Sequence, residues 1–224
     1  MAIYLTGGGE QEDYRQLDRL FMQELPAQSK IGLFAQATDE PQEALERIQY
    51  YFNDSKIKAI DLIENTKTDL NQYDALMIEG GNTFDLIRAV RDSAFFNSIK
   101  SFSQSGRPLY GDSAGAIILG CDVHTAFLGE DGDEDTQSLQ DYRGLDLINP
   151  WCVHAHATED EFDQLQDLMY EMGGPILAIS EETGVCLSEN EIKVFGKSDL
   201  WIFDFEGMKS IAPGQSFEYL GGLT

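Results

Sequence analysis

The chain has 224 residues, of which 42% are hydrophobic and 11% aromatic, so it can bury a sizeable core and is not of the disordered class. It carries 40 acidic and 15 basic residues, a formal net charge of −25. That charge repels nucleic acid and anionic membranes, so we expect neither as a partner. No apolar stretch approaches the length of a membrane span and no signal peptide is recognisable, which predicts a cytoplasmic protein.

The three cysteines, Cys121, Cys152 and Cys186, are odd in number and widely spaced. They indicate neither a disulfide framework nor a zinc site. The sequence shows no repeat, linker or low-complexity tract, so residues 1–224 are expected to form a single α/β domain. Neither a metal ion nor an organic cofactor is expected.

Short apolar runs alternate with segments of helical periodicity through the first half of the chain. The expected strands are residues 2–6, 30–37, 57–63, 74–79 and 107–110. The expected helices between them are residues 14–25, 44–52, 82–91 and 93–104. This alternation predicts a three-layer α/β fold, in which a mainly parallel sheet carries helices on both faces.

The alternation changes in the second half of the chain. Residues 128–144 are polar and acidic, which is typical of a loop. A strand over 151–156 and a helix over 159–172 follow. Four further short strands are expected at 176–180, 185–188, 192–195 and 200–205.

The most informative motif is GDSAGA, residues 111–116, which directly follows the fifth expected strand. It fits the G-x-S-x-G pattern of a nucleophile elbow, where a strand turns sharply into a helix with a serine at the tip. The serine is Ser113. A serine nucleophile also needs backbone N–H donors for the developing oxyanion. Ala114 follows the serine, and Gly81 lies in the GGN loop after the preceding strand, so these two residues are the candidate donors.

A serine nucleophile needs a base, and the three histidines of the chain are His124, His154 and His156. The last two are two residues apart, so on a strand their side chains would point the same way. The end of that strand places a histidine where it could reach the serine. Either could be the base, whereas His124 is expected to be structural. The acid that orients the base is expected among Glu130, Asp131, Asp133, Glu134 and Asp135.

A third glycine-rich segment, Gly7-Gly8-Gly9, follows the first expected strand. It matches neither the P-loop nor the dinucleotide-binding pattern, so a plain turn is predicted rather than a phosphate cradle.

These motifs resemble the dipeptidase E and cyanophycinase family of serine peptidases, which has the class I glutamine amidotransferase-like fold. The resemblance covers nearly the whole chain. It rests on GGNTF at 80–84, GDSAGA at 111–116, GLDL at 144–147 before a strand that ends in histidine, and the tail from ISEETG at 179–184 to Trp201.

By this resemblance Ser113 is the nucleophile, and Gly81 and Ala114 form the oxyanion hole. His156 is the preferred base and Glu130 the preferred acid. The implied function is that of a serine-dependent exopeptidase, which hydrolyses short peptides through an acyl-enzyme as a monomer or homodimer.

Two departures from the family pattern keep alternatives open. Asp112 stands where dipeptidase E often has an aromatic residue, and a buried carboxylate beside the serine would oppose alkoxide formation. The family's aspartyl preference needs a cation for the substrate carboxylate, yet Arg143 is the first arginine after the elbow, with Arg88 and Arg107 before it. The alternatives are a catalytically impaired binding or regulatory protein of the same fold, and an esterase.

Overall fold

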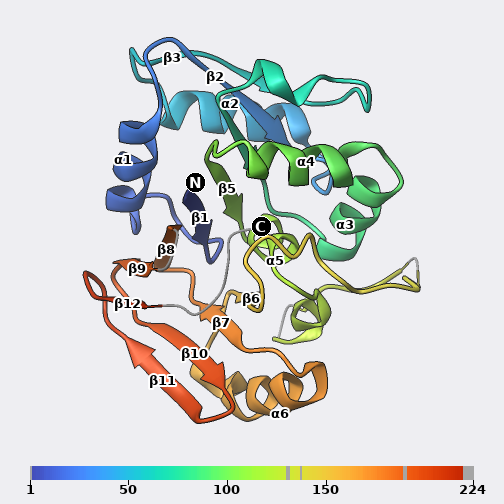
Figure 1. Cartoon of the computed structure of the whole chain (residues 1–224), viewed down its shortest axis with the longest axis vertical. Helices are drawn as coiled ribbons and strands as arrows, with labels where there is room; N and C mark the ends of the chain where they lie inside the picture. The colour runs from blue at the N-terminus through green and yellow to red at the C-terminus, as the bar shows by residue number, and fades with distance from the viewer. Residues whose placement is uncertain (1, 130–131, 137, 189–190, 219–224) are drawn as a thin grey trace.

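The computed structural model describes residues 2–129, 132–136, 138–188 and 191–218 (Figure 1). Its larger sheet has five parallel strands, β3 (Ile57–Leu62), β2 (Ser29–Phe34), β4 (Ala75–Ile78), β5 (Leu109–Asp112) and β1 (Ala2–Thr6), in that spatial order. Beside β1 the sheet continues with three antiparallel strands, β8 (Thr183–Ser188), β9 (Glu191–Gly196) and β12 (Ser216–Glu218).

Helices cover both faces of this sheet, as the three-layer prediction requires. One face carries α1 (Arg15–Glu24) and α2 (Pro41–Tyr51), and the other carries α3 (Thr83–Arg91), α4 (Phe95–Gln104) and α5 (Ala114–Leu119). The residues of β1 alternate between the two faces: Tyr4 packs with Phe21 of α1, while Ile3 and Leu5 belong to the core under α3, α4 and α5. Period-two alternation along a fully buried strand fills both cores at once.

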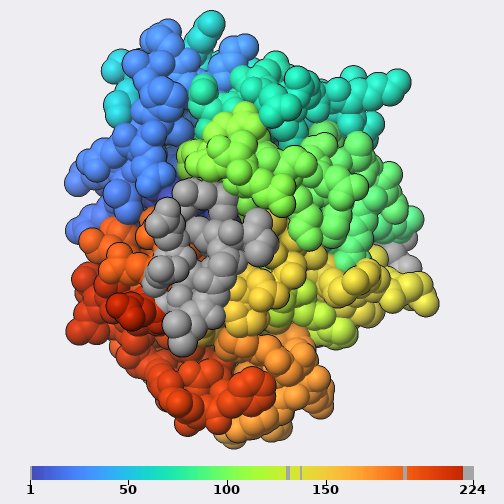
Figure 2. Space-filling model, in the orientation of Figure 1, coloured from blue at the N-terminus to red at the C-terminus, as the bar shows by residue number. Residues whose placement is uncertain are grey.

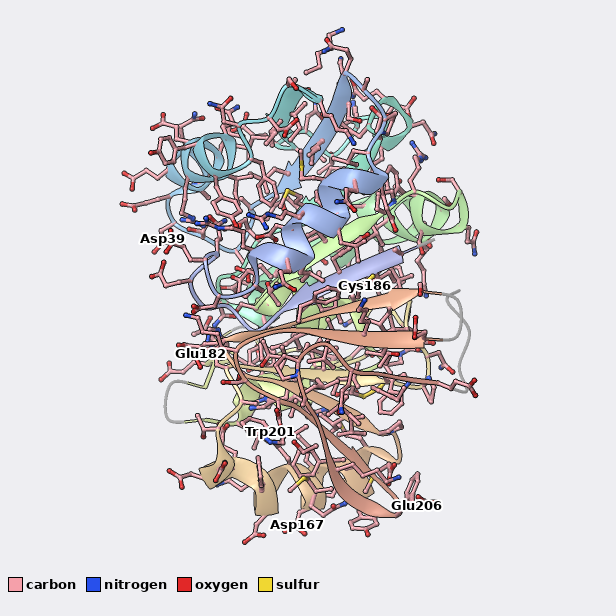
Figure 3. All side chains as sticks on the ribbon, turned by 90° about the vertical axis from the view of Figure 1, so that its left-hand side faces the viewer. Asp39, Asp167, Glu182, Cys186, Trp201 and Glu206 are labelled. Atoms are coloured by element: carbon pink, nitrogen blue, oxygen red, sulfur yellow. A yellow bond between two sulfur atoms is a disulfide. The ribbon has the colours of Figure 1, made fainter. Side chains whose placement is uncertain are left out.

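A second sheet, which the sequence did not predict as a separate unit, lies below the first in Figure 1. Its strands are β6 (Cys152–Ala155), β7 (Ile176–Ile179), β10 (Leu200–Asp204) and β11 (Gly207–Ile211), in the order β11-β10-β7-β6. One face packs against the core of α3 and α5, and the other against α6 (Phe162–Met172). Figure 3 shows this layering through Cys186 of β8, Trp201 of β10 and Asp167 of α6, from the middle of the molecule to its lower end.

The boundaries of the expected elements agree with the structure to within a few residues. The two strands that were not expected, β11 and β12, are short and contain no buried residue, so they lack the hydrophobic pattern that predicts a strand. The described part of residues 128–144 holds no helix and no strand. Within the described ranges, no helix is long and apolar enough to cross a bilayer.

A disulfide joins the segment after α5 to the first strand of the smaller sheet. Cys121 and Cys152 are bonded although 31 residues separate them, with their Cα atoms 4.8 Å apart. The expectation that the cysteines form no disulfide was therefore wrong. Cys121 comes just after α5, and Cys152 begins β6, which packs beside that helix, so the fold brings together what the sequence spaces widely. Cys186 is a free, buried thiol.

Candidate active site

Ser113 lies at the sharp turn between β5 and α5. Its backbone has φ 50° and ψ −117°, a conformation that L-residues rarely adopt and that costs about 1–3 kcal/mol. The surrounding chain holds it there: its N–H donates to the carbonyl oxygen of Thr6 at 3.1 Å, and its carbonyl accepts the N–H of Ala116 at 2.8 Å. A Cβ on Gly115 would lie 2.0 Å from the carbonyl oxygen of Ile78, so only glycine lets α5 approach the sheet here.

His156 faces the serine. Its Nε2 lies 2.7 Å from the Ser113 Oγ, and its Nδ1 lies 3.0 Å from an oxygen of Glu181. An Nδ1–H that donates to the carboxylate leaves the Nε2 lone pair facing the serine hydroxyl, which is the tautomer able to accept its proton. The side chains of His156 and Glu181 are 47% and 63% exposed, so substrate can reach this pair directly.

Glu181 is the residue that the sequence analysis missed. It follows β7, which pairs in parallel with β6, and the last residues of the two strands, Ala155 and Ile179, are partners in the ladder. Parallel neighbours end at the same edge of a sheet, so His156 and Glu181 leave it side by side. The acid was expected between the serine and the histidine in the chain, but Glu181 follows the strand that comes after the histidine and pairs in parallel with β6.

The acid chosen from the sequence, Glu130, lies outside the described residues, so its role stays a prediction. The described acidic residues that follow it have other partners. The Asp133 carboxylate accepts the backbone N–H of Thr83 at 2.8 Å, and Asp135 accepts the hydroxyl of Tyr142 at 2.8 Å. The first bond connects the acidic loop (residues 128–144) to the start of α3, and the second connects two residues within this loop.

His154, the alternative base, is buried in a separate hydrogen-bonded cluster. Its Nδ1 donates to the carbonyl oxygen of Thr125 at 3.0 Å, and its Nε2 faces Glu161 at 3.3 Å. Burial raises the pKa of Glu161, but hydrogen bonds from His154 and Thr158 outweigh that effect and lower it overall, so the carboxylate is ionised. Each ring nitrogen of His154 thus faces a protein oxygen, and neither faces Ser113.

The expectation that the two histidines point the same way was wrong. It assumed that the strand continues through His156, but β6 ends at Ala155. His156 has φ 55°, so the chain turns there and the side chain leaves the sheet direction that His154 keeps. That turn separates an exposed imidazole from a buried one.

One of the two predicted oxyanion donors, Ala114, belongs to the elbow, and the other, Gly81, belongs to the loop after β4. A Cβ on Gly80 would lie 3.2 Å from the Cβ of Ser113, which places the loop of residues 80–82 against that serine. Among the hydrogen bonds of the described residues, neither the N–H of Gly81 nor that of Ala114 has a protein acceptor. Both donors are therefore open to a substrate oxygen.

The Gly7-Gly8-Gly9 turn packs directly against the serine–histidine pair. Gly8 has φ +91°, and a Cβ there would lie 2.3 Å from the His156 ring and 2.9 Å from the Ser113 Cβ. The carbonyl oxygen of Gly7 accepts the backbone N–H of His156 at 3.1 Å. Beyond reversing the chain, the turn therefore supports His156 and admits only glycine at its centre.

Asp112 does not line the cavity around Ser113 but a second pocket of about 390 Å³ on the α2 side of the sheet. The Thr6 hydroxyl donates to it at 2.5 Å. Burial raises the pKa of Asp112, and burial together with the charge of Asp112 raises the pKa of neighbouring Glu79 to about 7, against the effect of its ion pair with Arg47. Asp112 therefore faces away from the cavity in which Ser113 would react.

Ser113 and His156 open into a cavity of about 990 Å³. It is walled by the start of α3, the acidic loop, the end of β6, the 3-10 helix η3 (Glu159–Glu161) and residues 180–182. Figure 3 labels Asp39, which follows β2, and Glu182, which follows β7, at the same edge of the molecule. The carboxyl ends of the parallel strands of both sheets thus meet at the cavity. Among residues 2–129, 132–136, 138–188 and 191–218, no group of three or more His, Cys, Asp or Glu is arranged to hold a metal ion.

Fold and site together define an α/β protein with a nucleophile elbow and a serine–histidine–glutamate arrangement at the carboxyl edge of its sheets. The chain belongs to Peptidase family S51, whose model matches residues 3–195.

Similar proteins agree with this family. A protein named Peptidase E from Nostoc sp. is 25% identical over 199 residues, which cover 84% of this chain and 80% of that protein. A Drosophila melanogaster protein named Probable alpha-aspartyl dipeptidase is 24% identical over 171 residues, 70% of this chain and 69% of its own. The crystal structure of a peptidase from an acI-B1 Actinobacterium superposes with a TM-score of 0.72 at 15% identity, covering 97% of this chain and 96% of its own, which shows a shared fold.

Proposed function

We propose that the protein is a serine peptidase that hydrolyses short peptides through an acyl-enzyme. The observation that carries the proposal is the 2.7 Å contact between the Ser113 Oγ and the His156 Nε2, formed by a strained elbow at the mouth of a cavity. Membership of a peptidase family supports the substrate class.

The geometry supports a defined sequence of steps. The Ser113 oxygen attacks the scissile carbonyl carbon as its proton passes to the Nε2 of His156, and the N–H groups of Gly81 and Ala114 donate to the oxyanion. Glu181 accepts the Nδ1–H and stabilises the imidazolium. The carbon–nitrogen bond then breaks, and His156 gives the proton to the leaving amine. Water, deprotonated by the same imidazole, hydrolyses the ester and frees the serine.

The size of the cavity and the names of relatives favour short substrates. A cavity of about 990 Å³ holds a few residues of peptide rather than a folded chain. A relative carries the name of a dipeptidase, which supports an exopeptidase. In this proposal residues 1–224 act as one domain, as a monomer or homodimer, and the steps above need no metal and no organic cofactor.

The test is Ser113→Ala compared with Ser101→Ala, which changes an exposed serine on α4. We expect Ser113→Ala to lower peptide hydrolysis at least about a thousandfold and to abolish labelling by a fluorophosphonate probe, with unchanged thermal unfolding. Ser101→Ala should match the parent protein.

Unchanged hydrolysis in Ser113→Ala would overturn the proposal. If the folded parent protein is neither labelled nor active, the binding-protein alternative holds. Activity on p-nitrophenyl esters without activity on short peptides would identify an esterase.

A further inference from the structure

The wall of the cavity around Ser113 is acidic, and no lysine or arginine lies in it. The residues outside the described ranges include no lysine or arginine either, so the chain offers none from there. Its acidic members are Asp133, Asp160, Glu161, Glu181 and Glu182.

The carboxylates of the wall are held in ways that preserve a negative field. The Glu161 carboxylate lies 3.3 Å from the Nε2 of buried His154. Asp133 accepts a backbone N–H of α3, and Glu182 accepts the Ser198 hydroxyl at 2.8 Å. Both donors are neutral, so neither hydrogen bond cancels the charge of the carboxylate. A cavity walled by one sign of charge concentrates ligands of the opposite sign.

The arginines that could have bound a substrate carboxylate are engaged elsewhere. Arg88 bonds to Asp92 at 3.3 Å, and Arg107 donates to the carbonyl oxygen of Tyr73 at 2.8 Å. Arg143 bonds to an aspartate of its own loop at 2.7 Å. A substrate carboxylate would therefore enter a negative cavity without a cationic partner, which is an unfavourable desolvation.

Thr83 supplies a second observation that points to a polar ligand. It lines the cavity beside Asp133, and only 1% of its surface is exposed. Its hydroxyl oxygen is buried and has no hydrogen-bond partner among the described residues. A buried polar atom without a partner costs stability, so its place in a binding cavity indicates a ligand that completes it.

We propose that this cavity selects peptides that place a protonated amine beside the scissile bond and rejects those with a carboxylate there. The proposal rests on the proposed peptidase function and sets this chain apart from a relative whose name refers to aspartyl dipeptides. The amine is the free α-amino group or a basic side chain, both of which Asp133, Asp160 and the Thr83 hydroxyl can receive.

The first experiment measures kcat/KM for the p-nitroanilides of lysine, leucine and aspartate, and for N-acetyl-lysine p-nitroanilide, at low ionic strength. We expect lysine to exceed aspartate by about a hundredfold, with leucine between them. If acetylation abolishes activity, the recognised amine is the α-amino group. If activity is retained, the recognised amine is the lysine side chain. Aspartate hydrolysed as fast as leucine or faster would overturn the proposal.

Binding measurements separate this inference from the proposed mechanism. Calorimetric titration of the Ser113→Ala protein with Lys-Ala, Leu-Ala and Asp-Ala reports charge selection without turnover. Tighter binding of Lys-Ala supports the inference even if Ser113 is not the nucleophile. Equal or tighter binding of Asp-Ala rejects it even if the parent protein is active.

Two pairs of variants localise the effect. Asp160→Lys, in the cavity wall, should lower the lysine-to-aspartate ratio of kcat/KM about tenfold. Asp167→Lys makes the same change of charge on the outer surface of α6, away from Glu182 in Figure 3, and should leave the ratio unchanged. Equal effects of the two would mean that net charge alone sorts the substrates, and would overturn the proposal.

Thr83→Val tests the hydroxyl. Its oxygen has no described protein partner, so stability should be unchanged while Lys-Ala binding weakens about five- to tenfold. The matched control is Thr125→Val, whose hydroxyl donates to the carbonyl oxygen of Val153 at 2.5 Å and whose loss should lower stability. Unchanged Lys-Ala binding by Thr83→Val would contradict the assignment of this residue to the ligand.

Discussion

Two histidines that are two residues apart in the chain each contact a carboxylate, and the two pairs differ in the chemistry that they allow. His156 and Glu181 are half-exposed, and one imidazole nitrogen remains free to face the Ser113 hydroxyl. His154 and Glu161 are buried, and both imidazole nitrogens of His154 face protein oxygens, those of Thr125 and Glu161. The comparison teaches that a histidine serves as a base only where the fold leaves it an unused lone pair and a proton donor opposite.

The largest expected effect is on the exposed pair. His156→Gln should lower kcat/KM about a thousandfold, because no group remains to take the serine proton, while thermal unfolding stays unchanged. The control is His124→Gln, which alters the third histidine, bonded to Asp122 at 2.6 Å. If His156→Gln keeps activity within threefold of the parent protein, the assignment of the base is wrong.

The buried pair should affect stability instead of rate. His154→Gln removes the imidazole that contacts the buried Glu161 carboxylate, so the free energy of unfolding should fall by about 1–3 kcal/mol. Chemical denaturation measures this loss, and the double variant with Glu161→Gln should recover part of it. A loss of activity equal to that of His156→Gln, at unchanged stability, would remove the distinction between the pairs.

A smaller effect is expected from the carboxylate of the exposed pair. Glu181→Gln should lower kcat/KM about 10- to 100-fold, less than a fully buried triad acid would, because water screens this exposed contact. Glu171→Gln, an exposed carboxylate on α6, provides the control for charge. Parent-like kinetics of Glu181→Gln would leave Glu130 as the remaining candidate for the acid.

The smallest effect concerns Glu79, a buried carboxyl whose pKa moves in the opposite direction from that of Glu161. Burial raises its pKa from 4.5 to about 7, so between these values the folded protein holds a proton that the unfolded chain releases. Stability should therefore fall by about 1–2 kcal/mol as the pH rises from about 4.5 to about 7.

Thermal unfolding from pH 4 to 8 measures that slope, and Glu79→Gln should flatten it. Glu46→Gln, an exposed change on the same helix as Arg47, should leave the slope as in the parent protein. A steeper slope in Glu79→Gln would show that the ion pair with Arg47 keeps Glu79 ionised.

Short-range patterns predicted most of the fold and half of the candidate site. The elbow at Ser113 was predictable because a strand, a turn and a helix are adjacent in sequence, and the glycines follow from local sterics. The parallel sheet was predictable from the alternation of strands and helices. His156 was identified together with His154 because the sequence does not show where the strand ends.

Features that depend on tertiary pairing were not predictable from local patterns. Glu181 reaches His156 only because β7 lies parallel to β6, and Cys121 meets Cys152 only because α5 packs beside β6. The second sheet depends on the same long-range choices. The cytoplasmic location stays a prediction, and the disulfide gives a reason to test it, since such bonds are rare in reducing compartments.

The division of the site between two sheets has a mechanical consequence. Ser113 follows a strand of the larger sheet, whereas His156 and Glu181 follow strands of the smaller one. On the face shown in Figure 2, the N-terminal half of the chain lies above and the C-terminal end lies below. A sliding of one sheet against the other by about an ångström would break the serine–histidine contact without unfolding either. The Cys121–Cys152 bond fixes the segment after α5 to the first strand of the smaller sheet, so a reductant would loosen the attachment of the strand that leads to His156.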